Sequence, residues 1–459
     1  SPNVVNLKRL PKVFPAICLK NSVNFERPKT LRKELLHFHP IFKAIMNTSY
    51  FINIKELTGI LPAGVTHLTG DDLNTIQSIS NAWLKVEDGI IADFGPMDSL
   101  PTKEFENVNT VDATGRLLLP AFIDSHTHLV FAGTREDEFI MRLNGASYEE
   151  IAAAGGGILN SAQKLQTASE DELYESAKAR LDDVISMGTG AIEIKSGYGL
   201  STESELKMLR VIKRLKQNSK ATIKATFLGA HAVPTQFKGQ PDAYLNYLLK
   251  ETLPKVAAEN LADYVDIFCE TGYFNANHTE QLLSAAHTLG IKAKIHVNQF
   301  TSIGGIQTAV KHKIVSVDHL EIMNEADFSS LENSQTIATL LPLCSFFINL
   351  PYSPAREMLK RNILIALASD YNPGSTPSGN MQLVQSAACV QMKLTPIEAF
   401  NASTINAAAA VNESKNLGSI TKGKKANLLL TKPIPSLGFM AYNFGHNHIE
   451  KVFLEGEEQ

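Results

Sequence analysis

The chain has 459 residues, of which 44% are apolar, and a formal net charge of −4. This is enough to bury one large domain and a smaller one. No apolar run approaches the roughly 20 residues that span a membrane, and the four cysteines are scattered without CxxC pairing. The composition therefore favours a cytoplasmic protein and excludes a membrane-spanning or disulfide-stabilised one.

Residues 1–45 form a basic leader that we do not expect to belong to the fold. They carry nine Lys/Arg against two Asp/Glu, whereas the rest of the chain is acidic. A basic arm can bind nucleic acid or a membrane, but this segment has no clean helical or RNA-binding pattern. We expect neither partner and interpret the leader as upstream sequence; a genuine extension is the alternative.

Short strands and turns are expected from residue 46 to about residue 116. The segment 82–95 alternates around Asp88-Gly89, which is a hairpin signal. Strand-like segments return at 426–430 and 449–454. Neither end alone holds enough strands for a stable sheet. We expect residues 46–116 and 415–459 to form one small β-sandwich domain together, which leaves 117–414 for the larger domain.

The triplet His126-Thr127-His128 follows the apolar run 117–124 and is the strongest signal of chemistry. Side chains two residues apart on a strand point the same way. Two imidazoles that project together make half of a metal site. An HxH triplet alone is not specific, and the triplets at 37–39 and 446–448 lack this setting.

Further ligand-type residues stand at the ends of later apolar runs. The segments 293–296, 315–319 and 363–370 end in His296, His319 and Asp370, with helical stretches such as 279–289 and 326–332 between them. One strand-end His or Asp is usually a cap or a loop residue. Several in order are typical of an α/β protein with a (β/α)8 TIM barrel and its site at the C-terminal strand ends.

This order of ligand-type residues resembles the amidohydrolase superfamily and, within it, the imidazolonepropionases of histidine breakdown. The resemblance runs from about residue 46 to the C-terminus. Its narrowest blocks are 155–158, 193–200 and 229–231, whereas those at 124–135 and 369–375 are common to many amidohydrolases. It implies hydrolysis of the cyclic amide of 4-imidazolone-5-propanoate to N-formimidoyl-L-glutamate by metal-activated water.

The ligand types suit one metal ion per chain, zinc or iron. His126, His128 and His296 offer neutral nitrogens and Asp370 an oxygen, which leaves a position for water. Such a metal lowers the pKa of water toward about 7. Asp370 is suited to accept the proton and pass it to the leaving nitrogen, and we expect His319 to orient Asp370 or the water.

Lys195 stands where many amidohydrolases carry a carbamylated lysine that bridges two metals. The motif around it resembles the mononuclear type, so we interpret this lysine as structural or as a support of the metal ligands. The glycines at 155–157 have no following Lys-Ser/Thr, so they favour a loop that approaches the site closely over a phosphate cradle.

The substrate that the resemblance implies is a small anion. Arg135 offers a planar fork for its carboxylate, Tyr148 and Tyr198 offer hydroxyl donors, and His231 is expected to donate to the ring carbonyl. Gln299 replaces a glutamate of some members; it can hydrogen-bond the ring nitrogens but cannot act as an ionised base. The resemblance adds three substrate or product contacts: Asn372, Gly374 and Ser375.

Three other functions remain as alternatives. A dihydroorotase or hydantoinase relative would need a carbamylated lysine and two metals. A deaminase shares the mononuclear ligand set, but the blocks around Arg135 and Tyr198 argue against it. A non-catalytic scaffold would usually have lost metal ligands. The oligomeric state stays open, with a homodimer as one option.

Overall fold

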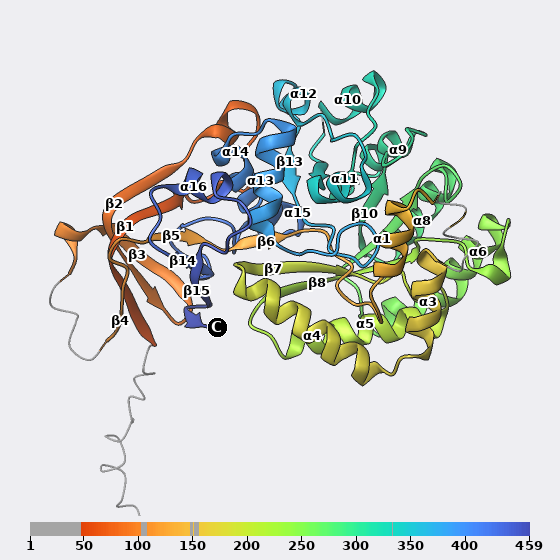
Figure 1. The fold of residues 1–459 in the computed structure, drawn as a ribbon, viewed down its shortest axis with the longest axis horizontal. Helices are drawn as coiled ribbons and strands as arrows, with labels where there is room; N and C mark the ends of the chain where they lie inside the picture. Colours follow the sequence, from red (N-terminus) through yellow and green to blue (C-terminus); the bar gives the residue numbers. More distant parts are fainter. Residues whose placement is uncertain (1–46, 102–107, 147–149, 151–155, 333) are drawn as a thin grey trace, which may run out of the picture. The chain divides into compact units, whose positions relative to one another are not determined.

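The computed structural model describes residues 47–101, 108–146, 150, 156–332 and 334–459. The leader, Tyr148 and Gly155 lie outside the described residues, so the expectations for them remain predictions. Two eight-stranded sheets organise the described part (Figure 1). None of its helices is both long and apolar enough to cross a membrane.

The first sheet is the parallel barrel. Its strands are joined in chain order, each one paired with the next. They are β6 (Phe122–Asp124), β7 (Thr189–Lys195), β8 (Thr222–Ala230), β9 (Tyr264–Cys269), β10 (Lys292–Val297), β11 (Ser316–His319), β12 (Ile337–Leu340) and β13 (Ile365–Leu367). The prediction of a TIM barrel is confirmed.

The two edge strands of this sheet meet just beyond their C-terminal ends. Thr127 and Tyr371 form a parallel bridge. The Asp370 N–H donates to the His126 carbonyl at 3.0 Å, and the His128 N–H donates to the Tyr371 carbonyl at 2.9 Å. The backbone therefore brings the HxH triplet against Asp370, although they are far apart in sequence.

Helices alternate with the barrel strands and cover them. Three of the described helices begin with a reciprocal capping box; Ser169 and Glu172 make the one on α4. The α-helices are α1 (Glu136–Leu143), α3 (Ile158–Thr167), α4 (Glu170–Ser186), α5 (Thr202–Gln217), α6 (Pro241–Tyr247), α7 (Leu253–Ala258), α8 (Ala276–Thr288), α9 (Gly305–Lys311), α10 (Glu325–Glu332), α11 (Pro342–Ile348), α12 (Ala355–Lys360), α13 (Met381–Met392), α14 (Pro396–Ala402), α15 (Ile405–Ala410) and α16 (Leu437–Tyr442). Shorter helical turns are η1 (Gly70–Asn74), η2 (Met97–Ser99), η4 (Thr235–Phe237) and η5 (Leu248–Thr252).

The second sheet is mixed and combines the two ends of the described chain, as expected. In Figure 1 its red and orange strands lie beside blue ones. Phe51 and Phe453 pack within its core with ring centroids 4.8 Å apart. The strands are β1 (Thr48–Ile60), β2 (Gln77–Glu87), β3 (Ile90–Pro96), β4 (Asn109–Asp112), β5 (Leu117–Pro120), β14 (Leu428–Thr431), β15 (Ile449–Leu454) and β16 (Glu457–Glu458).

Two local features of this sheet follow from sequence. The hairpin between β2 and β3 turns at Asp88 and Gly89 with φ of 48° and 78°, the left-handed pair that a two-residue turn favours. The apolar run 117–124 divides after Pro120: β5 pairs with β1 and β14, whereas β6 enters the barrel. The boundaries predicted between the two domains remain predictions.

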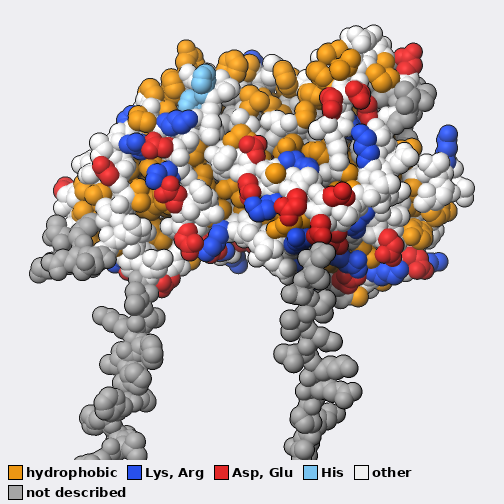
Figure 2. All heavy atoms as spheres, turned by 60° about the horizontal axis from the view of Figure 1, so that its bottom comes forward, with side chains coloured by type: hydrophobic (Ala, Val, Ile, Leu, Met, Phe, Trp, Pro, Cys, Tyr) orange, Lys and Arg blue, Asp and Glu red, His pale blue; other side chains and the backbone are white. Residues whose placement is uncertain are grey.

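Surface charge is mixed in sign. Figure 2 shows one face on which Lys/Arg and Asp/Glu side chains are interspersed among uncharged ones. Ion pairs at the protein surface include Arg210 with Glu259 and Lys216 with Asp263. Exposed pairs of this kind contribute little to stability.

Candidate active site

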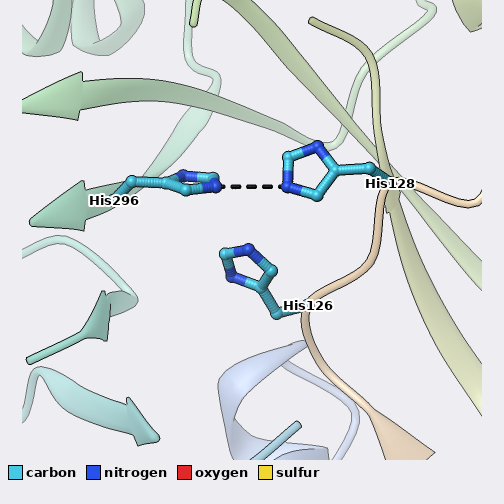
Figure 3. Close-up of side chains that lie close together, drawn as sticks. All are labelled: His126, His128 and His296. Carbon is cyan, nitrogen blue, oxygen red and sulfur yellow. Dashed lines mark hydrogen bonds between the residues drawn. The ribbon is translucent and has the colours of Figure 1, made fainter. Parts of the chain in front are cut away.

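Three histidines converge at the C-terminal end of the barrel (Figure 3). His126 and His128 follow β6, and His296 lies on β10. The Nε2 atoms of His128 and His296 are 3.2 Å apart, and one candidate ligand atom from each ring lies within 4.8 Å of the others. All three side chains are buried. The structure thus brings together the three imidazoles that the sequence singles out.

Asp370 and His319 complete the cluster. Asp370 Oδ1 lies 3.5 Å from His126 Nε2 and 3.6 Å from His128 Nε2. The His319 ring centroid is 5.4 Å from that of His296. Asp370 and His319 have φ of 58° and 92°, a region that residues other than glycine rarely adopt. Such backbone strain concentrates at functional sites.

The cluster has the properties of a metal site. His126 Nε2 and Asp370 Oδ1 are buried and have no hydrogen-bond partner among the described residues, which is costly without a cation between them. Burial lowers the pKa of His126, His128 and His296 well below its ordinary value. The rings are therefore neutral, which is the form that binds a metal.

Two buried carboxylates lie against the imidazoles, and sequence analysis did not single them out. Asp318 Oδ2 is hydrogen-bonded to His126 Nδ1 at 2.7 Å. Asp266 Oδ2 lies 2.9 Å from His296 Nδ1 without hydrogen-bond geometry, and Asp266 Oδ1 accepts from the His296 N–H at 3.1 Å. Contacts of this kind fix the ring so that its other nitrogen faces the ligand centre. Asp318 directly precedes His319, and Asp266 lies on β9. The alternation of side chains along these strands was the sequence pattern that could have indicated both carboxylates.

Lys195 belongs to this buried network. Its Nζ lies 2.7 Å from Glu193 Oε1 and 2.9 Å from Asp266 Oδ2, and Lys294 also pairs with Glu193. Burial would lower the pKa of Lys195, but Asp266, Glu193 and Asp318 together hold it above its usual value. Carbamylation needs a neutral amine, so this geometry favours the structural interpretation.

A cavity of about 310 Å³ opens beside the cluster. Its lining includes every described residue that was predicted to contact the substrate: Arg135, Tyr198, His231, Gln299, Asn372, Gly374 and Ser375. A larger hollow of about 1170 Å³ lies at the opposite end of the barrel strands, beside the starts of β10 and β12. Because that hollow touches none of the cluster, the smaller cavity is the candidate active site.

Arg135 is fixed by a carboxylate that the sequence interpretation missed. Its Nε donates to Glu138 Oε2 at 2.9 Å, and Nη2 donates to the same oxygen at 2.5 Å. Glu138 Oε1 accepts from the Gly157 N–H at 3.0 Å. The described part of the predicted glycine loop therefore contacts the partner of Arg135. The three-residue spacing from Arg135 to Glu138 could have predicted this ion pair from the sequence.

The loop after Asp370 is built around the Asn372 side chain. Its Nδ2 donates to the Asp370 carbonyl and to Ser375 Oγ, both at 2.7 Å, and its Oδ1 accepts from the N–H groups of Gly374 and Ser375, both at 2.8 Å. Ser375 Oγ in turn donates to Asp370 Oδ2 at 3.1 Å. Asn372 thus shapes the loop that presents Asp370.

The geometry of His231 differs from the donor role that the sequence suggests. Its Nδ1 lies 3.2 Å from the Gly197 carbonyl, which can only accept. Burial lowers the pKa of His231 to about 4, so the ring is neutral and carries its one proton on Nδ1. Nε2 is then an acceptor. Gly197 has φ of +112°, and a Cβ there would sit 2.9 Å from Nδ1, so glycine is required.

Gln299 reaches the far wall of the cavity, where its Nε2 lies 3.5 Å from Cys344 Sγ. On the other side, the Tyr198 ring packs 5.8 Å from His128 and 5.6 Å from His231, centroid to centroid. Burial raises the pKa of Tyr198 above its ordinary value, so the hydroxyl stays protonated. Both residues face the space beside the histidine cluster.

A parallel barrel with this cluster at its C-terminal end defines an amidohydrolase, and the model of the Amidohydrolase family matches residues 117–458. The imidazolonepropionase of Christiangramia forsetii is 54% identical over 405 residues, covering 88% of this chain and 98% of that protein. That of Clostridium tetani is 42% identical over 84% of this chain and 92% of that protein. The chain belongs to the imidazolonepropionase family.

Solved structures agree on the fold. Guanine deaminase of E. coli has a TM-score of 0.65 at 12% identity and covers 90% of this chain and 98% of that chain. An adenosine deaminase from Xanthomonas campestris, solved with bound zinc, has a TM-score of 0.63 at 13% identity, with 89% and 92% covered. At such identities the likeness speaks for the barrel alone.

Proposed function

We propose that this chain hydrolyses 4-imidazolone-5-propanoate to N-formimidoyl-L-glutamate in histidine degradation. The observation that carries the proposal is a buried His/Asp cluster beside a cavity whose described walls include the cations for an anionic tail. Membership of the imidazolonepropionase family supports it. The amide bond between the ring carbonyl and the adjacent nitrogen is the bond cleaved.

We further propose that one ion, zinc or iron, is held by His126, His128, His296 and Asp370. When bound, such an ion lowers the pKa of water and polarises a carbonyl oxygen. The buried charges fit a divalent cation. The carboxylates of Glu193, Asp266 and Asp318 lie against two ammonium groups, Lys195 and Lys294, which leaves one negative charge in this network. The carboxylate of Asp370, which faces His126 and His128, adds a second negative charge.

Asp370 is the residue we propose to move the proton. Burial raises its pKa to about 6, although His319 partly opposes the shift. A carboxyl group with this pKa can take a proton from the attacking water and release it to the leaving nitrogen near neutral pH. The hydrogen bond from Ser375 holds Oδ2 and leaves Oδ1 to face the cluster.

We propose that His319 donates a hydrogen bond at the site and that His231 accepts one. Burial lowers the pKa of His319, but Glu321, whose Oε1 lies 3.4 Å from Nδ1, outweighs it and raises the pKa above its ordinary value. His319 can therefore orient Asp370 or donate to the carbonyl oxygen as charge develops there. His231 Nε2 can accept a ring N–H. Gln299 can hydrogen-bond the opposite ring edge.

The experiment is a substrate panel at neutral pH. Purified protein should convert 4-imidazolone-5-propanoate and release no ammonia from adenosine or guanine, the substrates named by the fold relatives. Ammonia release without opening of the imidazolone ring would overturn the proposal in favour of a deaminase.

A further inference from the structure

We propose that Arg142, rather than Arg135 alone, supplies the unmatched positive charge that selects a carboxylate over a neutral tail. The inference rests on the proposed function and deepens it: Arg142 is a specificity residue for the anionic end of the substrate. Arg142 lies near the end of α1 and faces the same cavity as Arg135 and the histidine cluster.

The charge of Arg135 is already matched. Two of its nitrogens donate to the same oxygen of Glu138. Burial would raise the pKa of Glu138, but Arg135 outweighs it and lowers the pKa, so the carboxylate is ionised. Arg135 and Glu138 therefore form a neutral unit, which presents donors but little net charge.

Among the described residues, Arg142 forms no ion pair of its own, although the charge of Glu138, one turn earlier on α1, partly opposes the fall of its pKa. Its Nη1 is buried and unbonded among the described residues, and its Nη2 reaches only the Gly374 carbonyl, at 3.5 Å. The guanidinium lies 5.8 Å from the centroid of the Phe347 ring. Burial and then the charge of Arg135 lower its pKa, but a guanidinium stays charged at neutral pH. Arg142 as a whole is half-buried, and a guanidinium that is partly withdrawn from water without a carboxylate partner is costly. A carboxylate ligand bound beside Nη1 would offset that cost.

The geometry of α1 brings the side chains of Arg135, Glu138 and Arg142 to the same wall of the cavity. Glu138 and Arg142 are four residues apart on α1 and so share one face, and Arg135 precedes the helix. Arg135 Nη1 packs against Gly374, whose carbonyl is the acceptor for Arg142. A substrate carboxylate bound beside Gly374 would accept hydrogen bonds from both arginines, and the charge of Arg142 would neutralise it.

The test compares the carboxylate substrate with its carboxamide, which has the same shape and no charge. Arg142→Met keeps the stem and removes the charge. We expect it to raise KM for the carboxylate about tenfold to a hundredfold, the worth of a charged hydrogen bond, with a much smaller change in kcat. KM for the carboxamide should stay within about twofold. Arg142→Lys should restore part of the preference.

Two further variants separate charge from structure. Glu138→Gln in the Arg142→Met background releases the charge of Arg135 and should recover part of the carboxylate preference. Arg210→Met, on α5, removes an exposed arginine paired with Glu259 and should change nothing. Because Arg142 forms no ion pair within the described ranges, its replacement by Met should leave the melting temperature unchanged or raise it.

Binding of imidazole-4-propanoate, which has the same tail and no amide to cleave, is measured in parallel by calorimetry. This measurement separates the two proposals. If the protein binds the ligand in a charge-dependent way but does not turn over the substrate, the proposed function is overturned and the role of Arg142 stands. Equal KM changes for carboxylate and carboxamide, or an unchanged preference in Arg142→Met, would overturn the role of Arg142. Failure of the double variant to recover any preference would overturn the neutralisation of Arg135.

Discussion

Replacement of Gly374 by alanine tests how tightly the substrate loop and Arg135 fit together. A Cβ at this position would lie 2.2 Å from Arg135 Nη1 and 2.8 Å from Cζ. Ordinary contact begins at 3.4 Å, so the guanidinium must retreat by about 1 Å. A hydrogen bond lengthened by that amount is lost. A charged hydrogen bond is worth about 1.5–3 kcal/mol, so KM should rise about tenfold to a hundredfold with a smaller fall in kcat.

The assay is steady-state kinetics on 4-imidazolone-5-propanoate together with a melting curve. Gly438→Ala is the matched control, because its Cβ would approach nothing closer than 3.8 Å. Arg135→Lys should already raise KM, and Gly374→Ala should add little to it, since both act through the same fork. A KM within about twofold of wild type for Gly374→Ala, or additive effects in the double variant, would refute the reasoning.

Other predictions concern the cluster itself. Asp370→Asn should lower kcat by about 10²-fold or more because an amide is a poor base; retention of a tenth of the activity would contradict the assignment. His296→Ala should remove metal and activity together, as measured by metal analysis beside turnover. Asp318→Asn should weaken metal binding by about 10–100-fold, whereas normal affinity would show that His126 needs no orienting partner. Metal affinity should fall about tenfold per pH unit below about 6, where Asp370 gains a proton in the metal-free protein while the histidines stay neutral; a fall of about a hundredfold or more per pH unit would show that histidines are protonated as well.

The candidate metal ligands could be predicted from the sequence because each one stands in a short, recognisable pattern. An apolar run that ends in His296, His319 or Asp370 predicts a buried strand with a polar side chain at its end. Parallel strands of a barrel bring such ends together whatever their distance in sequence. The order of the runs therefore predicted both the fold and the meeting of these side chains.

The groups that support the cluster were not predictable in the same way. Asp266 lies on a strand that is otherwise apolar, Lys294 lies on the strand of His296, and each matters through a partner on another strand. Arg142 reads as a solvent-facing charge on a short helix, and only the packing of α1 against the loop of Gly374 turns it toward the cavity. The break after Pro120 was not predictable either, because the two halves of the apolar run 117–124 pair with strands of two different sheets.

The dependence of turnover on bound metal tests the proposed site most directly. Metal-depleted protein is titrated with zinc, and in a second series with ferrous iron, while opening of the 4-imidazolone-5-propanoate ring is followed. The site of three histidines and Asp370 predicts that activity rises linearly and saturates at about one equivalent per chain. Saturation at about two equivalents, or turnover that is indifferent to metal, would contradict it.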